Sequence, residues 1–482
     1  MSNSKFRRTA PIFLLGLALT SLVGCQNSSS DSDVIKITFW HTSGASLAGG
    51  FETAATEFEA LVLEHEGVKV EVTPSYQGNY DDIENKVTKG FATGTVPTIA
   101  IAYPDAVADF LALDTKNKGY VCDLSSYAED SEIGFGKESW FGDGPISDFV
   151  PAFYNEGSKY GKEGLYSLPF MKSSEALFYN YDRVAAYGKN YTPEGYTSPL
   201  SSASSIKNFM ANLTWDQLID FCRYIKSQSN SSQYTAPLWY DSDSNLFITE
   251  SYQRDIPYTS LGSDGTLSID FNNDAAKSMV SELKQDYDDG LLVTKGTQNT
   301  YGSDAFKNEK CVFSVGSTGG TDYNDPGDNF TSVAVKVPYA NDNPLYVSQG
   351  PTLCVLNSPG ESDETNSIRS KYAFKFIKYL TSTEVNAKLC VNYSSGYTPV
   401  RTSCYSTDLY TQWIEDSQDS LSGLAANVVV NELSDKYFTT PAAKGSSTTR
   451  DQVGGIITNV LLQDTSVESA FQSAYQQSVL AK

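Results

Sequence analysis

Several residue types that carry common enzyme chemistry are scarce or absent in this sequence. Histidine is represented only by His41 and His65 among 482 residues. This scarcity nearly eliminates histidine-based metal sites and leaves few candidates for a catalytic base. No C-x-x-C pair and no G-x-S-x-G sequence is present, so neither a zinc knuckle, nor a redox motif, nor a serine-hydrolase turn is indicated. We therefore expect no metal and no cofactor.

Basic residues are also few, with 35 Lys and Arg against 58 Asp and Glu, which gives a formal net charge of −23 at pH 7. A chain this acidic would repel phosphate backbones, so nucleic-acid binding is not expected. An anionic small ligand remains compatible with this charge, because one buried arginine can outweigh a distant diffuse field.

Long apolar runs are missing after residue 25, so no membrane-spanning segment is expected there. The short apolar run at 12–19 follows three basic residues and precedes Leu-Val-Gly-Cys, which predicts a signal peptide over residues 1–24. This ending resembles the bacterial lipobox, in which the Cys25 thiol is diacylated and the chain is cut before it. The alternative is an ordinary signal with a chance cysteine. A flexible tether at 25–33 would then hold the protein on the cell membrane, lipid-anchored at the extracytoplasmic face.

Six further cysteines leave two interpretations open, disulfides or buried free thiols. They stand at positions 122, 222, 311, 354, 390 and 404. Their spacings resemble no small disulfide-stapled scaffold, so a connectivity cannot be deduced.

The mature chain opens with alternating strand and helix patterns. Residues 34–40, 68–72 and 97–103 predict strands, and the periodic apolar residues between them predict helices that end at Gly67 and Gly94. Such alternation indicates a parallel sheet covered by helices, which binds ligands at the carboxyl ends of its strands.

A second α/β block follows the first. Residues 311–315 and 353–356 predict strands, and residues 275–290 predict a helix. Capping boxes at Thr214 and Thr465 predict the starts of two further helices. Because the chain is too long for one compact core of usual size, two lobes are expected.

Seven short sequences, weak one by one, occur in a fixed order along the chain. They are ITFWH at 37–41, YQGNY at 76–80, FATGTVPTI at 91–99, LPF at 168–170 with FYNYD at 178–182, FKNEK at 306–310, FKFIKYL at 374–380 and GYTPV at 396–400. In this order and spacing they resemble the extracellular solute-binding proteins of ABC importers. The closest likeness is to the sugar-binding group that includes maltose-binding and glycerol-3-phosphate-binding proteins.

The resemblance implies an α/β, two-lobed periplasmic-binding-protein fold of class II type. Each lobe would be a sheet flanked by helices, with the ligand in the interlobe cleft. Since the chain of such proteins crosses more than once, both lobes are discontinuous. By analogy, residues 34–172 and 345–392 form lobe 1, and residues 173–340 and 395–482 form lobe 2.

The same resemblance implies site residues in the first lobe and at the crossing. Tyr80 matches a tyrosine-bearing loop at the cleft. Asp105 lies within one residue of an acidic position that contacts ligand hydroxyls; the alternative is a solvated loop aspartate. The serine that relatives use after the crossing corresponds to Ser173 or Ser174. Gly350 matches a glycine of the cleft.

Further candidates come from the second lobe. Trp239 and Tyr240 stand where relatives offer a stacking platform, unless Trp239 lies in a core. Ser317 and Thr318 follow a predicted strand in a Gly-rich turn, whose backbone N–H groups could hold hydroxyl or phosphate oxygens. Tyr397 matches a cleft tyrosine.

Arg450 lies near the position of a phosphate-binding arginine in the glycerol-phosphate subgroup, although its flanking sequence departs from that subgroup. The alternative is a surface arginine. The 31 tyrosines suit a cleft in which aromatic faces pack against the C–H patches of a sugar, while most of them fill cores or cover surface.

Together these features predict a membrane-tethered, monomeric substrate-binding protein that captures a mono- or oligosaccharide and delivers it to the permease subunits of an ABC importer. It would not be an enzyme. The alternative ligand is glycerol-3-phosphate or a glycerophosphodiester, bound by the same mechanism. Alternatives from other classes are a secreted carbohydrate-active enzyme, with its acid and base among the many carboxylates, and a surface adhesin.

Overall fold

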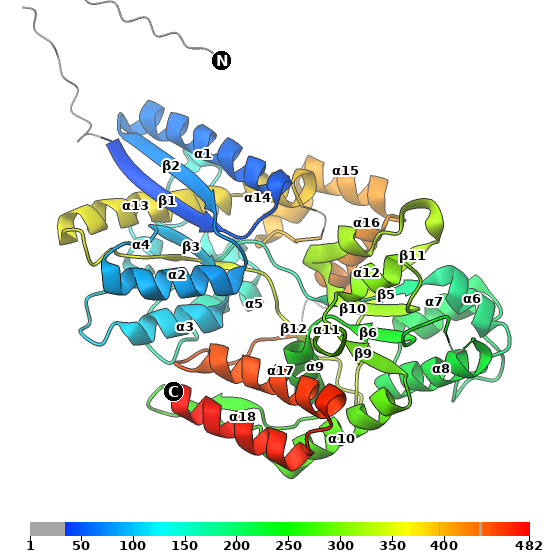
Figure 1. The fold of residues 1–482 in the computed structure, drawn as a ribbon. Coiled ribbons are helices and arrows are strands. Elements are labelled where there is room, and N and C mark those ends of the chain that lie inside the picture. The colour runs from blue at the N-terminus through cyan, green and yellow to red at the C-terminus, as the bar shows by residue number, and fades with distance from the viewer. Residues whose placement is uncertain (1–33, 231, 395, 433–435) are drawn as a thin grey trace, which may run out of the picture. The chain divides into compact units, whose positions relative to one another are not determined.

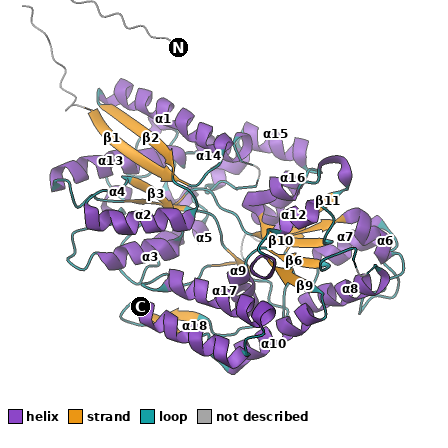
Figure 2. Cartoon of the chain, in the orientation of Figure 1, coloured by secondary structure: helices purple, strands orange, loops and turns teal. Residues whose placement is uncertain are grey.

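The computed structural model describes residues 34–230, 232–394, 396–432 and 436–482 (Figures 1 and 2). The predicted signal peptide, the tether and Cys25 lie outside these residues. Two mixed sheets, each flanked by helices, make up the described part of the chain.

The first sheet has five strands in the order β2-β1-β3-β13-β4. They are β1 (Val34–His41), β2 (Lys69–Tyr76), β3 (Ile99–Ala102), β4 (Leu168–Pro169) and β13 (Thr352–Val355). β1 and β3 are parallel, and β13 is antiparallel to β3 and β4. A strand from late in the sequence therefore completes a sheet that begins at the N-terminal end of the described chain.

Helices cover this sheet on both faces. They are α1 (Ala45–Glu66), α2 (Tyr80–Thr93), α3 (Pro104–Leu113), α13 (Asp363–Leu380) and α14 (Thr383–Asn392), with the short α4 (Ser125–Ala128) and α5 (Pro151–Tyr154) nearby. The chain steps from β1 to β2 on one side and then crosses back to β3 on the other side of β1. Right-handed connections therefore put α1 and α2 on opposite faces of the sheet (Figure 1). On the α1 face, the Phe39 ring lies 5.2 Å from that of Phe51 and 6.2 Å from that of Phe376.

Local sequence fixes the helix ends as expected. α2 starts in a capping box made by Asn79 and Asp82. Gly67 and Gly94 end α1 and α2 in the left-handed conformation, with φ of 68° and 79°. The predictions for these two glycines are confirmed.

The second sheet also has five strands, in the order β11-β5-β10-β6-β9. They are β5 (Glu175–Asn180), β6 (Leu238–Tyr240), β9 (Leu292–Thr294), β10 (Phe313–Ser317) and β11 (Ser332–Lys336). β9, β6 and β10 are parallel, while β5 is antiparallel to β10 and β11. The carboxyl ends of three neighbouring strands therefore meet at one edge.

The helices of this second part are more numerous. They are α6 (Tyr181–Gly188), α7 (Ala203–Ala211), α8 (Trp215–Gln228), α9 (Asp243–Gln253), α10 (Asp274–Asp288), α11 (Lys295–Gln298), α12 (Gly302–Lys307), α16 (Leu421–Asn427), α17 (Ser446–Gln463) and α18 (Val467–Ala481). The helix α15 (Asp408–Ser417) contacts both α14 of the first part and α16. A small hairpin joins β7 (Thr259–Leu261) to β8 (Leu267–Ile269). Thr214 caps α8 in the predicted capping box. The cap predicted at Thr465 is wrong by one residue, because Ser466 accepts the N–H of Ser469 at the start of α18.

Three segments of the chain lie side by side where it passes between the sheets. The first crossing segment contains Lys172 and Ser173, the second contains Gln349 and the third contains Thr398. Lys172 forms a β-bridge with Thr398, and Ser173 forms one with Gln349. β12 (Tyr346–Val347) pairs with β14 (Tyr437–Phe438) next to them. The ammonium of Lys172 is buried here, 2.6 Å from the carboxylate of Glu156.

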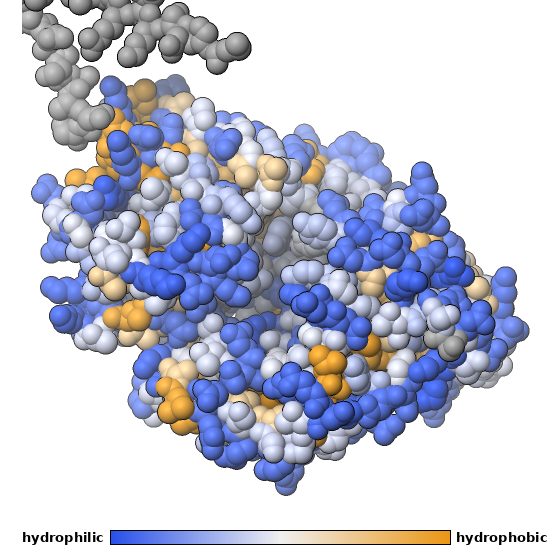
Figure 3. All heavy atoms as spheres, in the orientation of Figure 1, coloured by the Kyte–Doolittle hydropathy of each residue, from blue (hydrophilic) through white to orange (hydrophobic). Residues whose placement is uncertain are grey.

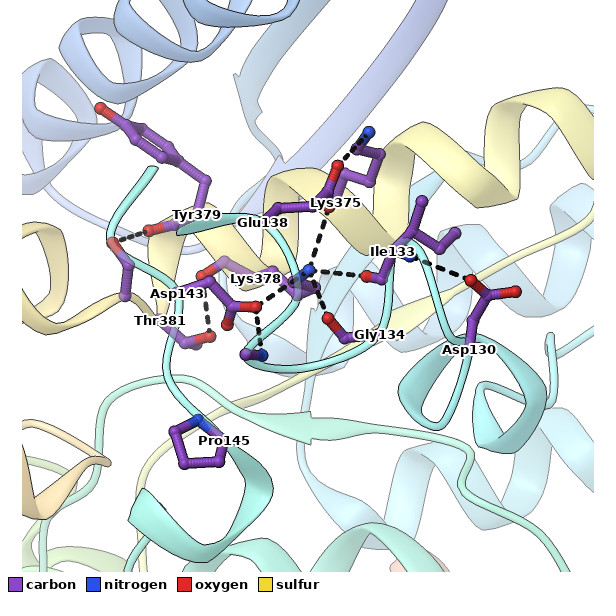
Figure 4. Close-up of polar contacts among 12 residues, drawn as sticks. Asp130, Ile133, Gly134, Glu138, Asp143, Pro145, Lys375, Lys378, Tyr379 and Thr381 are labelled. Carbon is purple, nitrogen blue, oxygen red and sulfur yellow. Dashed lines mark hydrogen bonds and ion pairs between the residues drawn. The ribbon is translucent and has the colours of Figure 1, made fainter. Parts of the chain in front are cut away.

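A buried network of charges fixes one loop of the first part against α13 (Figure 4). The ammonium of Lys378 donates to two loop carbonyls and lies 3.0 Å from the carboxylates of Glu138 and Asp143. Arg401, which follows the third crossing segment, is fully buried and lies 3.4 Å from Asp143. Charges buried in this way stabilise the fold only as a set, because losing one partner leaves another uncompensated.

The six cysteines of the described chain are buried free thiols. Of the two interpretations that the sequence left open, the structure therefore contains the second. Within the described ranges, no helix is long and apolar enough to cross a membrane.

Candidate ligand-binding site

The polar edges of the two sheets supply the candidate site. β3 ends before Tyr103, β6 ends at Tyr240 and β10 ends at Ser317. Ligands of open α/β sheets bind beyond such carboxyl ends. Figure 3 shows a hollow in the surface between the segments that carry the two sheets.

Three tyrosines form an aromatic cluster on the side of the first sheet. Tyr80 starts α2 and Tyr103 precedes α3; their ring centroids lie 4.5 Å apart. The hydroxyl of Tyr80 is hydrogen-bonded to that of Tyr397. A Cβ atom on Gly319 would lie 2.9 Å from the Tyr397 ring, so the glycine lets a loop of the second sheet approach this cluster closely.

The surrounding protein desolvates the hydroxyls of these three rings, although the Tyr103 ring itself is still 37 % exposed. This desolvation raises the pKa of the Tyr80 and Tyr103 hydroxyls well above their ordinary range, and it raises that of Tyr397. All three hydroxyls therefore stay neutral at physiological pH and can both donate and accept hydrogen bonds. The cluster offers aromatic faces and neutral polar groups together.

A chain of hydrogen bonds crosses the second sheet next to the cluster. The carboxylate of Glu175 accepts from the Tyr240 hydroxyl at 2.7 Å and from the Asn245 amide at 2.9 Å. The amide oxygen of Asn245 in turn accepts from the guanidinium of Arg450. We call these four residues the Glu175 relay. It joins β5, β6, α9 and α17.

The relay and its surroundings hold an unusual balance of charge. Burial raises the pKa of Glu175 to about 7, although hydrogen bonds from Tyr240 and Asn245 and the charge of Arg450 oppose this rise. Burial raises the pKa of Asp105 to about 6, again against Arg450. Among the residues that the structure describes, Arg450 has no carboxylate within salt-bridge distance. One cation thus lies among carboxyls that are partly protonated near neutral pH.

The start of α17 also contacts the helices of the first sheet. The N–H of Gly445 donates to Asp109 of α3 at 2.8 Å, and the Ser447 hydroxyl donates to Glu84 of α2 at 3.3 Å. α17 has no side-chain cap of its own, so these carboxylates satisfy the positive end of its dipole. Burial, and next the charge of Asp109, raise the pKa of Glu84 to about 7.

Five of the residues proposed from the sequence come together here. Tyr80 and Tyr397 are hydrogen-bonded, Tyr240 and Arg450 belong to the Glu175 relay, and Asp105 lies within the electrostatic range of Arg450. They come from segments spread between positions 80 and 450 of the sequence.

The remaining polar candidates lie at the crossing. The Ser174 hydroxyl donates to the Val347 carbonyl at 2.8 Å, and the Ser174 N–H donates to Thr318 at 3.2 Å. Ser173 accepts a long hydrogen bond of 3.5 Å from Ser317, the one exposed member of this group. In the structure these side chains bond mainly to the protein itself.

Gly350 occupies the same crossing for a steric reason. Its φ is +93°, and a Cβ atom there would collide with the carbonyl of Met171 and the Cα of Lys172. The glycine allows the second and first crossing segments to touch.

Trp239 is not a stacking platform in this structure. It is 3 % exposed and packs in a hydrophobic cluster with Phe178 and Phe306. Successive residues of a strand point to opposite faces, so Trp239 and Tyr240 of β6 enter different cores. Only Tyr240 reaches the relay.

Sequence reasoning missed Glu175, Asn245 and Tyr103. Two of them lie close to candidates that it did find: Glu175 follows Ser174, and Tyr103 stands two residues before Asp105. A carboxylate at the start of an otherwise apolar strand was the available signal for Glu175. No group of at least three His, Cys, Asp or Glu side chains in the described ranges could hold a metal ion.

Two α/β sheets joined by three crossing segments, with aromatic and polar side chains at their facing edges, define a two-lobed solute receptor. The family model described as bacterial extracellular solute-binding protein matches residues 53–416. The sn-glycerol-3-phosphate-binding periplasmic protein UgpB of Escherichia coli O6:K15:H31 is 24 % identical over 410 residues, which cover 83 % of this chain and 80 % of the relative.

Solved structures share the fold. UgpB from Mycobacterium tuberculosis, solved with glycerophosphocholine, superposes with a TM-score of 0.69 at 15 % identity, covering 92 % of this chain and 98 % of that one. The GacH receptor of Streptomyces glaucescens, solved unliganded and with acarbose, gives 0.65 at 19 % identity over the same shares.

This chain therefore belongs to the bacterial extracellular solute-binding proteins. It is the solute-binding protein of an ABC importer and acts outside the cytoplasm. Its family consists of binding proteins, so the enzyme alternative is set aside, and the predicted two-lobed α/β fold is confirmed.

Proposed function

We propose that this receptor captures a neutral carbohydrate between its two sheets. The observation that carries the proposal is the tyrosine cluster of Tyr80, Tyr103 and Tyr397 beside the Glu175 relay. Aromatic faces pack against the C–H patches of a sugar, while carboxyl, amide and hydroxyl groups satisfy its hydroxyls.

The charge of the site supports a neutral ligand. Glu175, Asp105, Asp109 and Glu84 outnumber Arg450, the cation of the relay. An anion bound at Arg450 would bring these carboxyls a further negative neighbour at close range. The structural neighbours include receptors solved with acarbose and with maltose.

One observation favours a second candidate, glycerol-3-phosphate or a glycerophosphodiester. The guanidinium of Arg450 donates to an amide and, within the described chain, is in no salt bridge. A half-buried guanidinium of this kind can take a phosphate in bidentate fashion. The relatives named for glycerol-3-phosphate and solved with glycerophosphocholine support this candidate as well.

A thermal-shift screen tests the two candidates together. The purified protein is melted with neutral mono- and oligosaccharides, glycerol-3-phosphate and glycerophosphocholine. A ligand at about a hundred times its Kd stabilises the native state by roughly 2.7 kcal/mol, which raises Tm measurably. If only the phosphate compounds raise Tm, and Arg450→Gln abolishes that rise, the carbohydrate proposal is wrong.

The mechanism that goes with this proposal is closure of two lobes on the ligand. We take lobe 1 as residues 34–172 and 345–392 and lobe 2 as residues 173–340 and 395–482, with the crossing segments as the hinge. The closed monomer would then dock on the permease. Ligand contacts made only in the closed state would stabilise closure.

Lipidation of Cys25 would hold the receptor near the permease on the outer face of the membrane. The tether raises the effective concentration of receptor without a new contact. Replacing Cys25 with serine should release a folded protein that still binds ligand. Retention of that variant in the membrane fraction would refute the anchor.

A further inference from the structure

Exposed aromatic rings in this protein are concentrated in one kind of place. Among the described residues, the large exposed hydrophobic side chains include four tyrosines and no phenylalanine or tryptophan. They are Tyr76, Tyr103, Tyr301 and Tyr323, with 63 %, 37 %, 51 % and 68 % of their surface exposed. Tyr76 ends β2, Tyr103 directly follows β3, and Tyr301 and Tyr323 lie in the segments that come after β9 and β10. Ligands of open α/β sheets bind beyond such carboxyl ends of the strands.

Two of these tyrosines belong to the first sheet. Tyr76 is the last residue of β2, and its ring centroid lies 6.3 Å from that of His41, the last residue of β1. The N–H of Gln77 donates to the His41 carbonyl at 2.9 Å, so the two strands end side by side. Tyr103 directly follows β3 and contacts Tyr80 of the tyrosine cluster. The exposed rings thus extend this cluster along the sheet edge.

On the second sheet, Tyr323 extends the edge in the same way. It lies in the 3₁₀ segment Thr318–Asn324, which directly follows β10. The same segment contains Gly319, against which the Tyr397 ring packs. The proximity of Tyr323 also contributes to the raised pKa of Tyr397. Tyr323 is therefore an outer neighbour of the tyrosine cluster.

Tyr301 lies beyond β9 and is held in position by its neighbours. The Lys295 ammonium lies 4.1 Å from the Tyr301 ring centroid and donates to its hydroxyl at 2.9 Å. The next residue, Gly302, donates its N–H to the carboxylate of Asp241, which follows β6. A ring that is braced in this way and still half exposed loses little conformational freedom on binding a ligand.

A ring of this size left in water exposes apolar surface that folding normally buries. Apart from Leu261 in the β7–β8 hairpin, the large exposed aliphatic side chains of the described residues lie in helices; Ile368, for example, lies within α13. Rings that remain open at the ligand edge of both sheets, outside an already formed central cluster, provide flat surfaces for more ligand than a single sugar ring.

We propose that the ligand is an oligosaccharide, a trisaccharide or longer, and that Tyr301 and Tyr323 on one side and Tyr76 on the other bind its outer units. This inference rests on the proposed carbohydrate function. One sugar unit lies at the central tyrosine cluster, and the neighbouring units stack on the outer rings. The neutral hydroxyls of these rings add hydrogen bonds to the outer units.

The test is isothermal titration of the purified protein with homologous sugar series, each from monosaccharide to tetrasaccharide. The probes are α-1,4-glucans, β-1,4-glucans and β-1,4-xylans. In the series that binds, affinity should rise at least about tenfold from the monosaccharide to the trisaccharide. Tyr301→Ala and Tyr323→Ala should each weaken tetrasaccharide binding about five- to tenfold and leave monosaccharide binding unchanged.

Ile368→Ala is the matched control, since it truncates an exposed hydrophobic side chain away from the strand ends. It should change no affinity. A monosaccharide that binds as tightly as the tetrasaccharide would overturn the inference and leave the carbohydrate function standing. Unchanged tetrasaccharide binding by both tyrosine variants would overturn it as well. If phosphate compounds bind and no sugar of any length does, the proposed function itself falls.

Discussion

The Glu175 relay makes a sharp prediction for the substitution Glu175→Gln in the unliganded protein. Glu175 is 3 % exposed, and its carboxylate is held by the neutral donors Tyr240 and Asn245. Burial raises its pKa from an ordinary value of 4.5 to about 7. Glutamine has nearly the same shape and carries no charge at any pH, so the exchange isolates the effect of ionising a buried carboxyl.

The sign follows from the raised pKa. Below pH 4.5 the carboxyl is protonated in both folded and unfolded chains, and its full contribution to stability is present. Between pH 4.5 and about 7 the unfolded chain ionises first, so stability falls as pH rises. The gap between the two pKa values corresponds to roughly 3 kcal/mol at pH 8. The wild-type protein carries this penalty, and the glutamine variant does not.

The variant also loses one accepted hydrogen bond, because its amide nitrogen cannot accept from Tyr240 or Asn245. That loss costs about 1 kcal/mol at every pH. We therefore expect Glu175→Gln to be more stable than the wild type by about 2 kcal/mol at pH 8, and to match it or fall slightly below it near pH 5.

Urea unfolding at a series of pH values, followed by circular dichroism, measures this difference. Glu309→Gln is the control, since Glu309 is a partly exposed carboxylate paired with Arg183, and its loss should change stability by less than about 1 kcal/mol. If the stability difference of Glu175→Gln is the same at pH 5 and pH 8, the reasoning about its ionisation is refuted.

Three further substitutions test other parts of the structure. Arg401→Met leaves the buried carboxylate of Asp143 short of a partner, so urea unfolding should show a loss of about 3–5 kcal/mol; a loss below about 1 kcal/mol would contradict the role given to the network. Gly350→Ala forces a side chain into a φ of +93° at the crossing and should lower stability by at least about 1–3 kcal/mol in thermal unfolding. Asp109→Asn weakens the contact with the Gly445 N–H and should raise the Kd of whichever probe binds by about threefold to tenfold in titration calorimetry; an unchanged Kd would separate this contact from ligand binding.

Much of the fold could be predicted because its signals are local. The helix ends at Gly67 and Gly94 depend on a residue that tolerates positive φ, and both occur where expected. The predicted start of α18 was wrong by one residue because Thr465 and Ser466 are adjacent residues that both carry a hydroxyl group. Which of them has the extended backbone of a cap depends on how the helix packs, and the sequence does not contain that information.

The site could be predicted only in part, for a related reason. Tyr80, Tyr397 and Arg450 were proposed through a family resemblance, which carries three-dimensional information about distant positions, and they remain candidates that the structure brings into one region. Trp239 was misassigned because aromatic character does not say which face of a strand a side chain takes. Glu175 was missed because its partners come from distant positions in the sequence.

The placement of α17 links recognition to the contact between the two sheets. Its first turn meets Asp109 of α3, and on the same helix Arg450 reaches Asn245 and, through it, Glu175. A helix moves as a nearly rigid body, so a displacement that loosens the contact at Gly445 also moves the guanidinium. In the proposed mechanism the ligand lies between Arg450 and the tyrosines of the first sheet. Closure and the formation of the ligand contacts are then one motion of one helix, and a molecule that touches only a single sheet gains nothing from it.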